Sequence, residues 1–412
     1  MQFSKIALAA VAAVAFAGQA QAATTFMTGA SATSLNYVKA LQTLCGGTFT
    51  VYKETTSTSS LGNFFTAKCS QDFTGLSGVD AVAFNVAGGS YTAVLNSTLG
   101  TGGVKFVTAL SGTPVAGTGA LAGINLVRGI TAAGAIQSVG GFMDVEPGAF
   151  DPALVEPFGG VEGLADKVAG ANFYQAFGVA VSRDLYAALQ AAQGLTPACD
   201  ADNLTPACQP TVSRAQYASI AAATFNSAKT SVNSLFGVPA GKLTLCRRAS
   251  TSGTQGASNQ FFLNNLTGNG PNAGLEAPAD AATYGPGVLA TFEVMEGAGT
   301  GNARDCLNAA GYGIGVLSLE NVPAASTGYR YVKLNRVEGF DATTASKGTA
   351  INGEYEFAYQ SFKFTADGAG TNDVIEAIDA QLTDLGAANG LWGAGQSQFG
   401  RNGNNANVVT KQ

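Results

Sequence analysis

Two adjacent arginines, Arg247 and Arg248, are followed by a turn rich in hydroxyl groups and glycine, a combination that can bind an anion. An apolar run precedes them and a helix-forming segment follows the turn, which predicts a strand–turn–helix junction. The first N–H groups of a helix lack partners within it and lie at the positive end of its dipole. Ser252 and Thr254 would add hydroxyl donors, Gly253 would permit close backbone approach, and an arginine would offer a planar fork. The stretch also fits a capped helix with surface arginines, because short motifs recur by chance.

Hydroxyl-bearing residues also stand at the start of two further predicted helices. Near the beginning of the mature chain, a short strand enters a small-residue turn that ends in Thr33 and Ser34, and apolar spacing predicts a helix over 35–41. A buried strand predicted over 79–86 enters a glycine turn that ends in Ser90, before another helical segment. The first of these junctions, taken alone, is better explained as an ordinary helix cap.

Strands alternate with helices along the chain, which predicts α/β layers rather than a β-sandwich. Further strands are predicted at 173–181, 310–318, 329–334 and 355–364, and further helices at 182–193, 257–263 and 374–385. Residues 45–75 are rich in threonine and serine, so we expect an irregular insertion closed by a disulfide there. Residues 100–140 carry no clear periodicity, and no element is predicted for them.

The first 22 residues are typical of a secretion signal. Lys5 is followed by a short apolar run, and an A-x-A cleavage motif lies at 20–22. The run is too short to span a bilayer, and the first cysteine, Cys45, lies far from the cleavage point, so no lipid anchor is expected. The mature chain should begin at Ala23 and reside in the periplasm or outside the cell, without stable membrane insertion.

Charge and residue types narrow the possible functions. The net charge of −6 argues against nucleic acid or an anionic membrane surface as a partner, but not against a small anion held by local donors. The chain has no histidine, which excludes a Ser-His-Asp hydrolase and histidine-ligated zinc. A carboxylate metal site is conceivable, but no spaced acidic cluster supports one. We therefore expect neither a metal nor a cofactor, and no enzyme activity.

Six cysteines in an exported chain imply disulfides. Many pairings are possible. Proximity favours two of them and leaves a third by elimination: Cys45–Cys69, Cys199–Cys208 and Cys246–Cys306. The alternative is that one pair is free or scrambled. The loop at 199–208 contains Asp200 and Asp202 but lacks the glycine and distal glutamate of a calcium loop, so it is interpreted as a polar tip.

Five segments, taken in chain order, resemble the motifs of a known family. T-G-A-S-A-T at 28–33 is similar to T-G-A-G-A-T, and R-R-A-S-T-S-G-T at 247–254 is similar to R-R-A-D-G-S-G-T. Residues 84–90 resemble a strand that ends in a G-S-S-G turn, 143–147 more loosely an S-D-x-P segment, and 313–316 a later G-x-I-G-Y strand. These are motifs of the periplasmic phosphate-binding proteins of ABC phosphate-uptake systems, in the type 2 periplasmic binding protein superfamily. The chain resembles a divergent member, with insertions at about 42–75 and 100–140.

The resemblance implies an α/β fold of two lobes, joined by two crossing strands, with a central anion cleft. Lobe one would comprise 23–172 plus 357–412, and 173–356 would form a hinge strand and lobe two. The crossing strands would be 173–181 and 357–364. Helix starts from both lobes would converge on the cleft, and closure would replace the water around the anion with protein donors.

The resemblance also implies a set of ligand-binding residues: Thr33, Ser34, Ser90, Asp144, Arg248, Ser252, Gly253 and Thr254. Asp144 would accept a hydrogen bond from a phosphate hydroxyl, which would distinguish a protonated oxyanion from sulfate. Asp144 could equally cap a turn, and for Arg247 a surface or interdomain ion pair is the favoured interpretation. In the family, an aspartate after R-R-A orients the binding arginine; Ser250 stands at that position here.

The favoured function is therefore an exported solute-binding protein that captures phosphate or a similar tetrahedral oxyanion for an inner-membrane ABC permease. Other tetrahedral oxyanions or a phosphorylated organic molecule are alternative ligands. A second hypothesis is a secreted structural or adhesive protein that kept the fold and lost the ligand, since a fold does not fix a function. A phosphoesterase is less favoured, because the recognisable groups are donors rather than a nucleophile and base.

Overall fold

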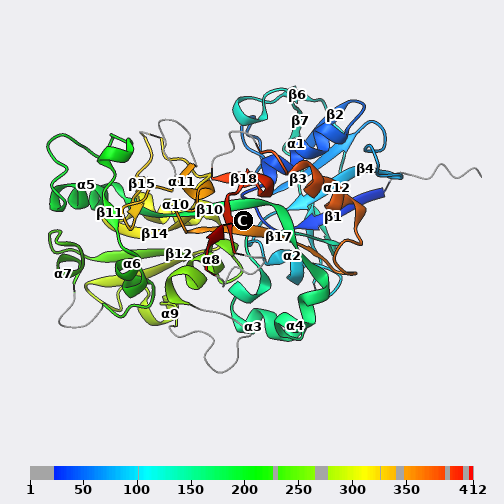
Figure 1. The fold of residues 1–412 in the computed structure, drawn as a ribbon. Coiled ribbons are helices and arrows are strands. Elements are labelled where there is room, and N and C mark those ends of the chain that lie inside the picture. The colour runs from blue at the N-terminus through cyan, green and yellow to red at the C-terminus, as the bar shows by residue number, and fades with distance from the viewer. Residues whose placement is uncertain are drawn as a thin grey trace, which may run out of the picture.

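One large mixed sheet runs through the whole molecule (Figure 1). The computed structural model describes residues 23–100, 102–225, 231–264, 277–324, 326–339, 348–385, 390–401 and 408–411, so the predicted secretion signal lies outside the described residues. Within them, the sheet has the order β13 (Phe292–Gly297), β12 (Leu243–Arg248), β14 (Tyr312–Ser318), β10 (Val168–Ser182), β17 (Ala358–Thr365), β9 (Gly140–Met143), β1 (Ala23–Thr28), β4 (Val79–Asn85), β3 (Phe64–Cys69), β2 (Phe49–Lys53), β7 (Asn125–Arg128) and β6 (Val115–Ala116). Two further strands, β15 (Tyr329–Tyr331) and β18 (Leu391–Gly393), also pair with β10.

The two central strands, β10 and β17, join the two halves of this sheet. The first part of β10 pairs antiparallel with β17, and its last part, from Phe177 to Val181, pairs with β14. On its other side β17 pairs antiparallel with β9. One lobe therefore holds the strands from β9 to β6, the other holds β12 to β14, and Figure 1 shows β10 and β17 between them. The fold class predicted from the sequence, two α/β lobes joined by two crossing strands, is confirmed.

Helices pack on both lobes and bury their apolar faces. The longer ones are α1 (Ser34–Leu44), α5 (Arg183–Ala192), α6 (Arg214–Ala221), α8 (Gly253–Leu263), α10 (Thr300–Ala309) and α12 (Asp373–Gln381). The shorter ones are α2 (Thr92–Leu95), α3 (Pro152–Val155), α4 (Gly160–Leu164), α7 (Val232–Phe236), α9 (Ala281–Tyr284) and α11 (Gly348–Ile351). None of the helices in the described part of the chain has the length and apolar character that crossing a bilayer requires.

Two clusters of buried apolar side chains form the core. The smaller one lies in the first lobe, where α1 and α12 contribute Val38, Leu41 and Ile378 and the strands contribute Phe65 and others. The larger one extends from the second lobe under the central strands into the first. Short two-stranded pairs complete the fold: β5 (Val104–Phe106) with β8 (Ala133–Ile136), β11 (Thr211–Val212) with β16 (Lys333–Leu334), and β19 (Phe399–Gly400) with β20 (Thr410–Lys411).

The prediction that residues 45–75 are irregular is wrong. This segment forms β2 and β3, an antiparallel pair within the main sheet, and β2 also pairs with β7 from the unassigned region 100–140. Threonine and serine conceal the alternation of buried residues, because Thr50 and Thr66 are themselves buried beside Val51 and Phe65. β-Branched threonine suits a pleated strand, so a Thr-rich composition did not exclude a sheet.

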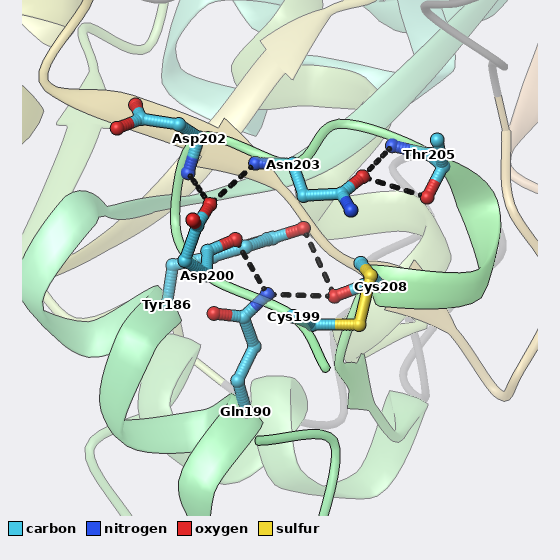
Figure 2. The surroundings of a disulfide bond; sticks show 8 residues. All are labelled: Tyr186, Gln190, Cys199, Asp200, Asp202, Asn203, Thr205 and Cys208. Atoms are coloured by element: carbon cyan, nitrogen blue, oxygen red, sulfur yellow. Dashed lines mark hydrogen bonds between the residues drawn. A yellow bond between two sulfur atoms is a disulfide. The ribbon is translucent and has the colours of Figure 1, made fainter. Parts of the chain in front are cut away.

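All three predicted disulfides are present: Cys45–Cys69, Cys199–Cys208 and Cys246–Cys306. The last one connects β12 to α10. Figure 2 shows how helix α5 holds the loop closed by Cys199–Cys208: Gln190 Nε2 donates to the carbonyls of Asp200 and Cys208. Asp200 Oδ1 accepts the backbone N–H groups of Asp202 and Asn203. These local contacts agree with the predicted polar tip.

Candidate functional site

A cleft of about 650 Å³ lies between the lobes, and the starts of two helices line it. Ser31 and Ser34 belong to the start of α1 in the first lobe, and residues 299–302 belong to the start of α10 in the second. The loop at 59–63 forms another part of the wall. Because the first N–H groups of each helix are unpaired within it and carry partial positive charge, two such starts facing one cleft favour an anion.

Arg248, the last residue of β12, lies in the wall of the cleft and is 4% exposed. One terminal nitrogen donates to Thr300 Oγ1 at 2.6 Å, and the other donates to the carbonyl of Ala298 at 3.2 Å. The Nε–H is buried and has no hydrogen-bond partner among the described residues. The start of α10 thus orients the guanidinium of Arg248, a role that the motif described above gives to an aspartate at the position of Ser250. The Nε–H of Arg248 stays available as a donor.

Ser90, Asp144 and Gly253 converge beside Arg248 from different elements. Ser90 precedes α2, Asp144 follows β9, and Gly253 is the first residue of α8. A Cβ atom added to Gly253 would lie 2.3 Å from Ser90 Oγ and 2.5 Å from Asp144 Oδ2. Only glycine fits such a close approach.

The polar atoms of this group are buried and largely unpaired. Ser90 Oγ and Asp144 Oδ1 make no hydrogen bond within the described part of the chain. Burial raises the pKa of Asp144 to about 6, although the nearby charge of Arg248 and the hydroxyl of Ser90 act to lower it. Ser90 therefore lies near enough to influence the carboxyl electrostatically, without the geometry of a hydrogen bond. Buried polar atoms without partners are costly, so this group is suited to receive one from a ligand or water.

The remaining predicted residues lie around these two groups. Ser34 is half-buried and lines the cleft with Arg248. Thr33 is buried and its hydroxyl donates to the hydroxyl of Tyr37. Ser252 and Thr254 are buried at the start of α8, outside the cleft wall. The eight residues thus fall into a cleft-lining pair, the buried group at Asp144, and three residues at helix starts.

Glu320 lines the cleft and was not among the predicted residues. It follows β14, and its Oε1 accepts hydrogen bonds from Ser318 Oγ at 2.6 Å and Asn321 Nδ2 at 2.8 Å. Burial, with a smaller contribution from the charge of Asp144, raises the pKa of Glu320 to about 7. A carboxylate just after a buried strand is the same sequence signal that drew attention to Asp144, and it could have identified Glu320.

Arg247 faces away from the cleft. Its Nε lies 3.5 Å from Glu296 Oε2, and NH1 donates to the carbonyl of Ala279 at 2.6 Å. Arg247 thus forms an ion pair, but its guanidinium is buried and its partner lies on the neighbouring strand of the same lobe, rather than at the surface or between the lobes. The two adjacent arginines have different surroundings because neighbouring strand residues point to opposite faces.

The lobes contact each other directly at the turn after β12. The backbone N–H of Tyr91 donates to the carbonyl of Thr251 at 3.0 Å, and the hydroxyl of Thr251 donates to the carbonyl of Gly88. These bonds join the turn before α2 to the turn before α8. Among the described residues, no group of three or more cysteine, aspartate or glutamate side chains gathers where it could hold a metal ion.

No protein-family model matches the chain, and no curated protein matches its sequence. Similar solved structures are phosphate-binding proteins, the kind whose motifs the sequence resembles. A Clostridium perfringens protein described as a phosphate ABC transporter substrate-binding protein, with bound phosphate, is 10% identical over 88% of this chain and 94% of that chain, with a TM-score of 0.43. A phosphate-binding protein from Stenotrophomonas maltophilia is 12% identical over 90% and 87%, with a TM-score of 0.41. An ABC-type phosphate transport receptor from Vibrio cholerae is 12% identical over 61% and 81%, with a TM-score of 0.33. At these values the ligands of those proteins are no guide to the ligand of this chain, which has to be inferred from its own contacts.

Proposed function

We propose that this protein is an exported solute-binding protein that captures phosphate or a similar tetrahedral oxyanion in the cleft between its lobes. The observation that carries the proposal is Arg248, a buried guanidinium in the cleft wall with an unpaired Nε–H. It lies between helix starts of opposite lobes. A buried cation that retains a free donor is an effective partner for an oxyanion, because charge-assisted hydrogen bonds are strong away from water.

In the proposed complex, each lobe contributes donors. Residues 23–172 and 357–412 would form lobe one, which supplies Thr33, Ser34 and Ser90. Residues 173–356 would form the hinge strand and lobe two, which supplies Arg248. The turn from Ser252 through Gly253 to Thr254, also expected to donate, lies next to the cleft and outside its wall. Asp144 would accept a hydrogen bond from a hydroxyl of the oxyanion and so disfavour sulfate, which has no proton to donate.

Transport is the proposed context. The A-x-A motif at 20–22, three disulfides and the resemblance to phosphate-uptake proteins support export to the periplasm and delivery to an inner-membrane ABC permease. The proposed role involves no covalent chemistry, since the cleft offers donors and acceptors for binding.

A secreted structural or adhesive role is the second candidate. The direct bonds from Thr251 to Gly88 and from Tyr91 to Thr251 favour it, because they hold the lobes together through the protein itself. In that case the cleft would be a remnant of the fold.

Calorimetry on the mature, disulfide-intact protein distinguishes the two candidates. We expect phosphate to bind and sulfate not to compete, and Arg248→Ala to lower the affinity by about 100-fold or more, as expected for lost charge-assisted hydrogen bonds of about 1.5–3 kcal/mol each. Arg247→Lys and Arg248→Lys form a matched pair, one residue apart. Only the second should weaken binding, because lysine lacks the planar fork. The transport role is wrong if the wild-type protein gives neither heat nor a thermal shift with phosphate.

A further inference from the structure

Glu320 presents an unused acceptor beside Arg248. Its Oε1 is fully engaged by Ser318 and Asn321, whereas its Oε2 is buried and has no hydrogen-bond partner among the described residues. Its carboxylate is near enough to favour the charged form of Arg248, as Asp144 also does. Arg248 therefore lies near two carboxylates, which follow two different strands, β9 and β14.

The pairing of the central strands brings Glu320 close to β10. β14 runs antiparallel to β10 with Phe177 opposite Ser318, and the N–H of Leu319 donates to the carbonyl of Ala176 at 3.0 Å. Glu320 is the next residue, in the turn beyond β14, so it lies close to the middle of β10, where the two lobes meet.

The neighbouring ladder places Asp144 in the same central region. β17 pairs with β9 so that Phe362 lies opposite Met143, the residue before Asp144. The hydroxyl of Ser361, next to Phe362, is also buried without a hydrogen-bond partner within the described chain. Both carboxylates, Asp144 and Glu320, are near enough to Arg248 to act on its charge.

The unpaired atoms define what a ligand must bring. Asp144 Oδ1 and Glu320 Oε2 are acceptors when ionised, and Arg248 Nε–H is a donor. An oxyanion oxygen can pair with the arginine directly. It can approach each carboxylate only through a proton, which is carried either by the oxyanion or by the carboxyl group.

We propose that Glu320 is a second proton-sharing acceptor for the bound oxyanion, so that the cleft takes up its ligand together with two bridging protons, one at Asp144 and one at Glu320. This inference rests on the proposed function of the cleft. The preferred ligand is an oxyanion with two ionisable hydroxyls, such as phosphate. Sulfate carries neither proton and is repelled by both carboxylates.

No other ionisable group described around Glu320 takes the place of the oxyanion as its partner. Arg304 and Asp305 of α10 line the cleft but are exposed to water, which screens their charges. Tyr329 and Tyr331 of β15 lie on the inner side, where burial raises their pKa values, so both stay neutral near pH 7. Because the pKa of Glu320 is about 7, Glu320 loses its proton over the same pH range in which phosphate becomes a dianion.

The test is the pH dependence of phosphate affinity, measured by calorimetry from pH 6 to pH 9 in wild type, Glu320→Gln and Asp305→Asn. In wild type we expect the affinity to fall about tenfold per pH unit above about pH 7, because one bridging proton must then be supplied on binding. Glu320→Gln keeps the shape and an Oε1 acceptor and replaces Oε2 with an amide donor. That amide pairs with an oxyanion directly, so this slope should disappear.

Asp305→Asn removes an exposed carboxylate of the same cleft and should keep the wild-type slope. Sulfate should stay excluded in Glu320→Gln at pH 8, because Asp144 remains. If phosphate binds through Arg248 but wild type and Glu320→Gln share one pH slope, Glu320 is no acceptor and the inference is wrong, while the proposed function stands. If phosphate does not bind to wild type at any of these pH values, both are wrong.

Discussion

At the scale of single residues, the cost of burying Asp144 links the folded state to pH. The fold raises the pKa of this carboxyl from 3.8 to about 6, mainly because burial disfavours its charge. The folded state therefore prefers the protonated form. That contribution to stability is complete below about pH 4 and is lost as the pH rises through about 6, and it amounts to about 3 kcal/mol.

Asp144→Asn isolates this effect, because asparagine has nearly the same shape and does not ionise. In phosphate-free buffer, the free energy of unfolding of wild type minus that of Asp144→Asn should fall by about 3 kcal/mol between pH 3 and pH 7.5. Urea unfolding at a series of pH values measures it. A difference that stays constant with pH would contradict the desolvation of Asp144.

At the scale of elements, two helix starts in the second lobe have different roles. The start of α10 holds Arg248 through Thr300 and lines the cleft. The start of α8 packs against Asp144, with no room for a side chain at Gly253: a Cβ there would lie 2.6 Å from Asp144 Cβ, an atom that cannot swing away. α8 therefore serves mainly to fit the lobes closely together, next to the cleft.

Two glycines, each in the first turn of its helix, test this division. Gly253→Ala should destabilise the protein by about 1–3 kcal/mol through overpacking and weaken phosphate binding, because the lobes must separate slightly. Gly301→Ala in α10 meets no atom within 4 Å and should be neutral or stabilise by up to about 1 kcal/mol. Urea unfolding and calorimetry give both quantities. Equal losses of stability in the two variants would show that α8 is not tightly packed here.

At the scale of the whole molecule, two crossing strands and one turn determine how the lobes sit. β10 pairs with β14 of the second lobe and with β17, which in turn pairs with β9 of the first, so a small change in these two strands would move one lobe relative to the other. The hydroxyl of Thr251 adds a hydrogen bond across the cleft to the carbonyl of Gly88. Such a bond contributes about 1 kcal/mol to the closed arrangement.

Thr251→Val removes this hydroxyl with little change in volume. In the absence of phosphate, we expect small-angle scattering to give a larger radius of gyration for Thr251→Val than for wild type. Saturating phosphate should restore the wild-type value, because a ligand that binds only the closed state shifts the population toward it. Thr371→Val, whose hydroxyl bonds to Gly368 within one turn, is the matched control and should scatter like wild type. Identical profiles for all three proteins would mean that Thr251 does not govern closure.

The sequence by itself determined the local features: the alternation of strands and helices, the three disulfides, the helix starts rich in hydroxyl groups, and Arg248 at the end of a strand. Apart from the disulfides, which were paired by proximity along the chain and by elimination, these features depend on periodicity, capping and turn residues within a few positions of one another. Composition misled at 45–75, where buried threonines made two strands of the main sheet look like an insertion. Only the tertiary structure decided that α10, rather than α8, meets α1 at the cleft, and that Glu320 and Asp144 both lie near Arg248. Those relations join residues far apart in the chain, and they follow from the register of the central strands and the packing of the two lobes, which no local pattern encodes.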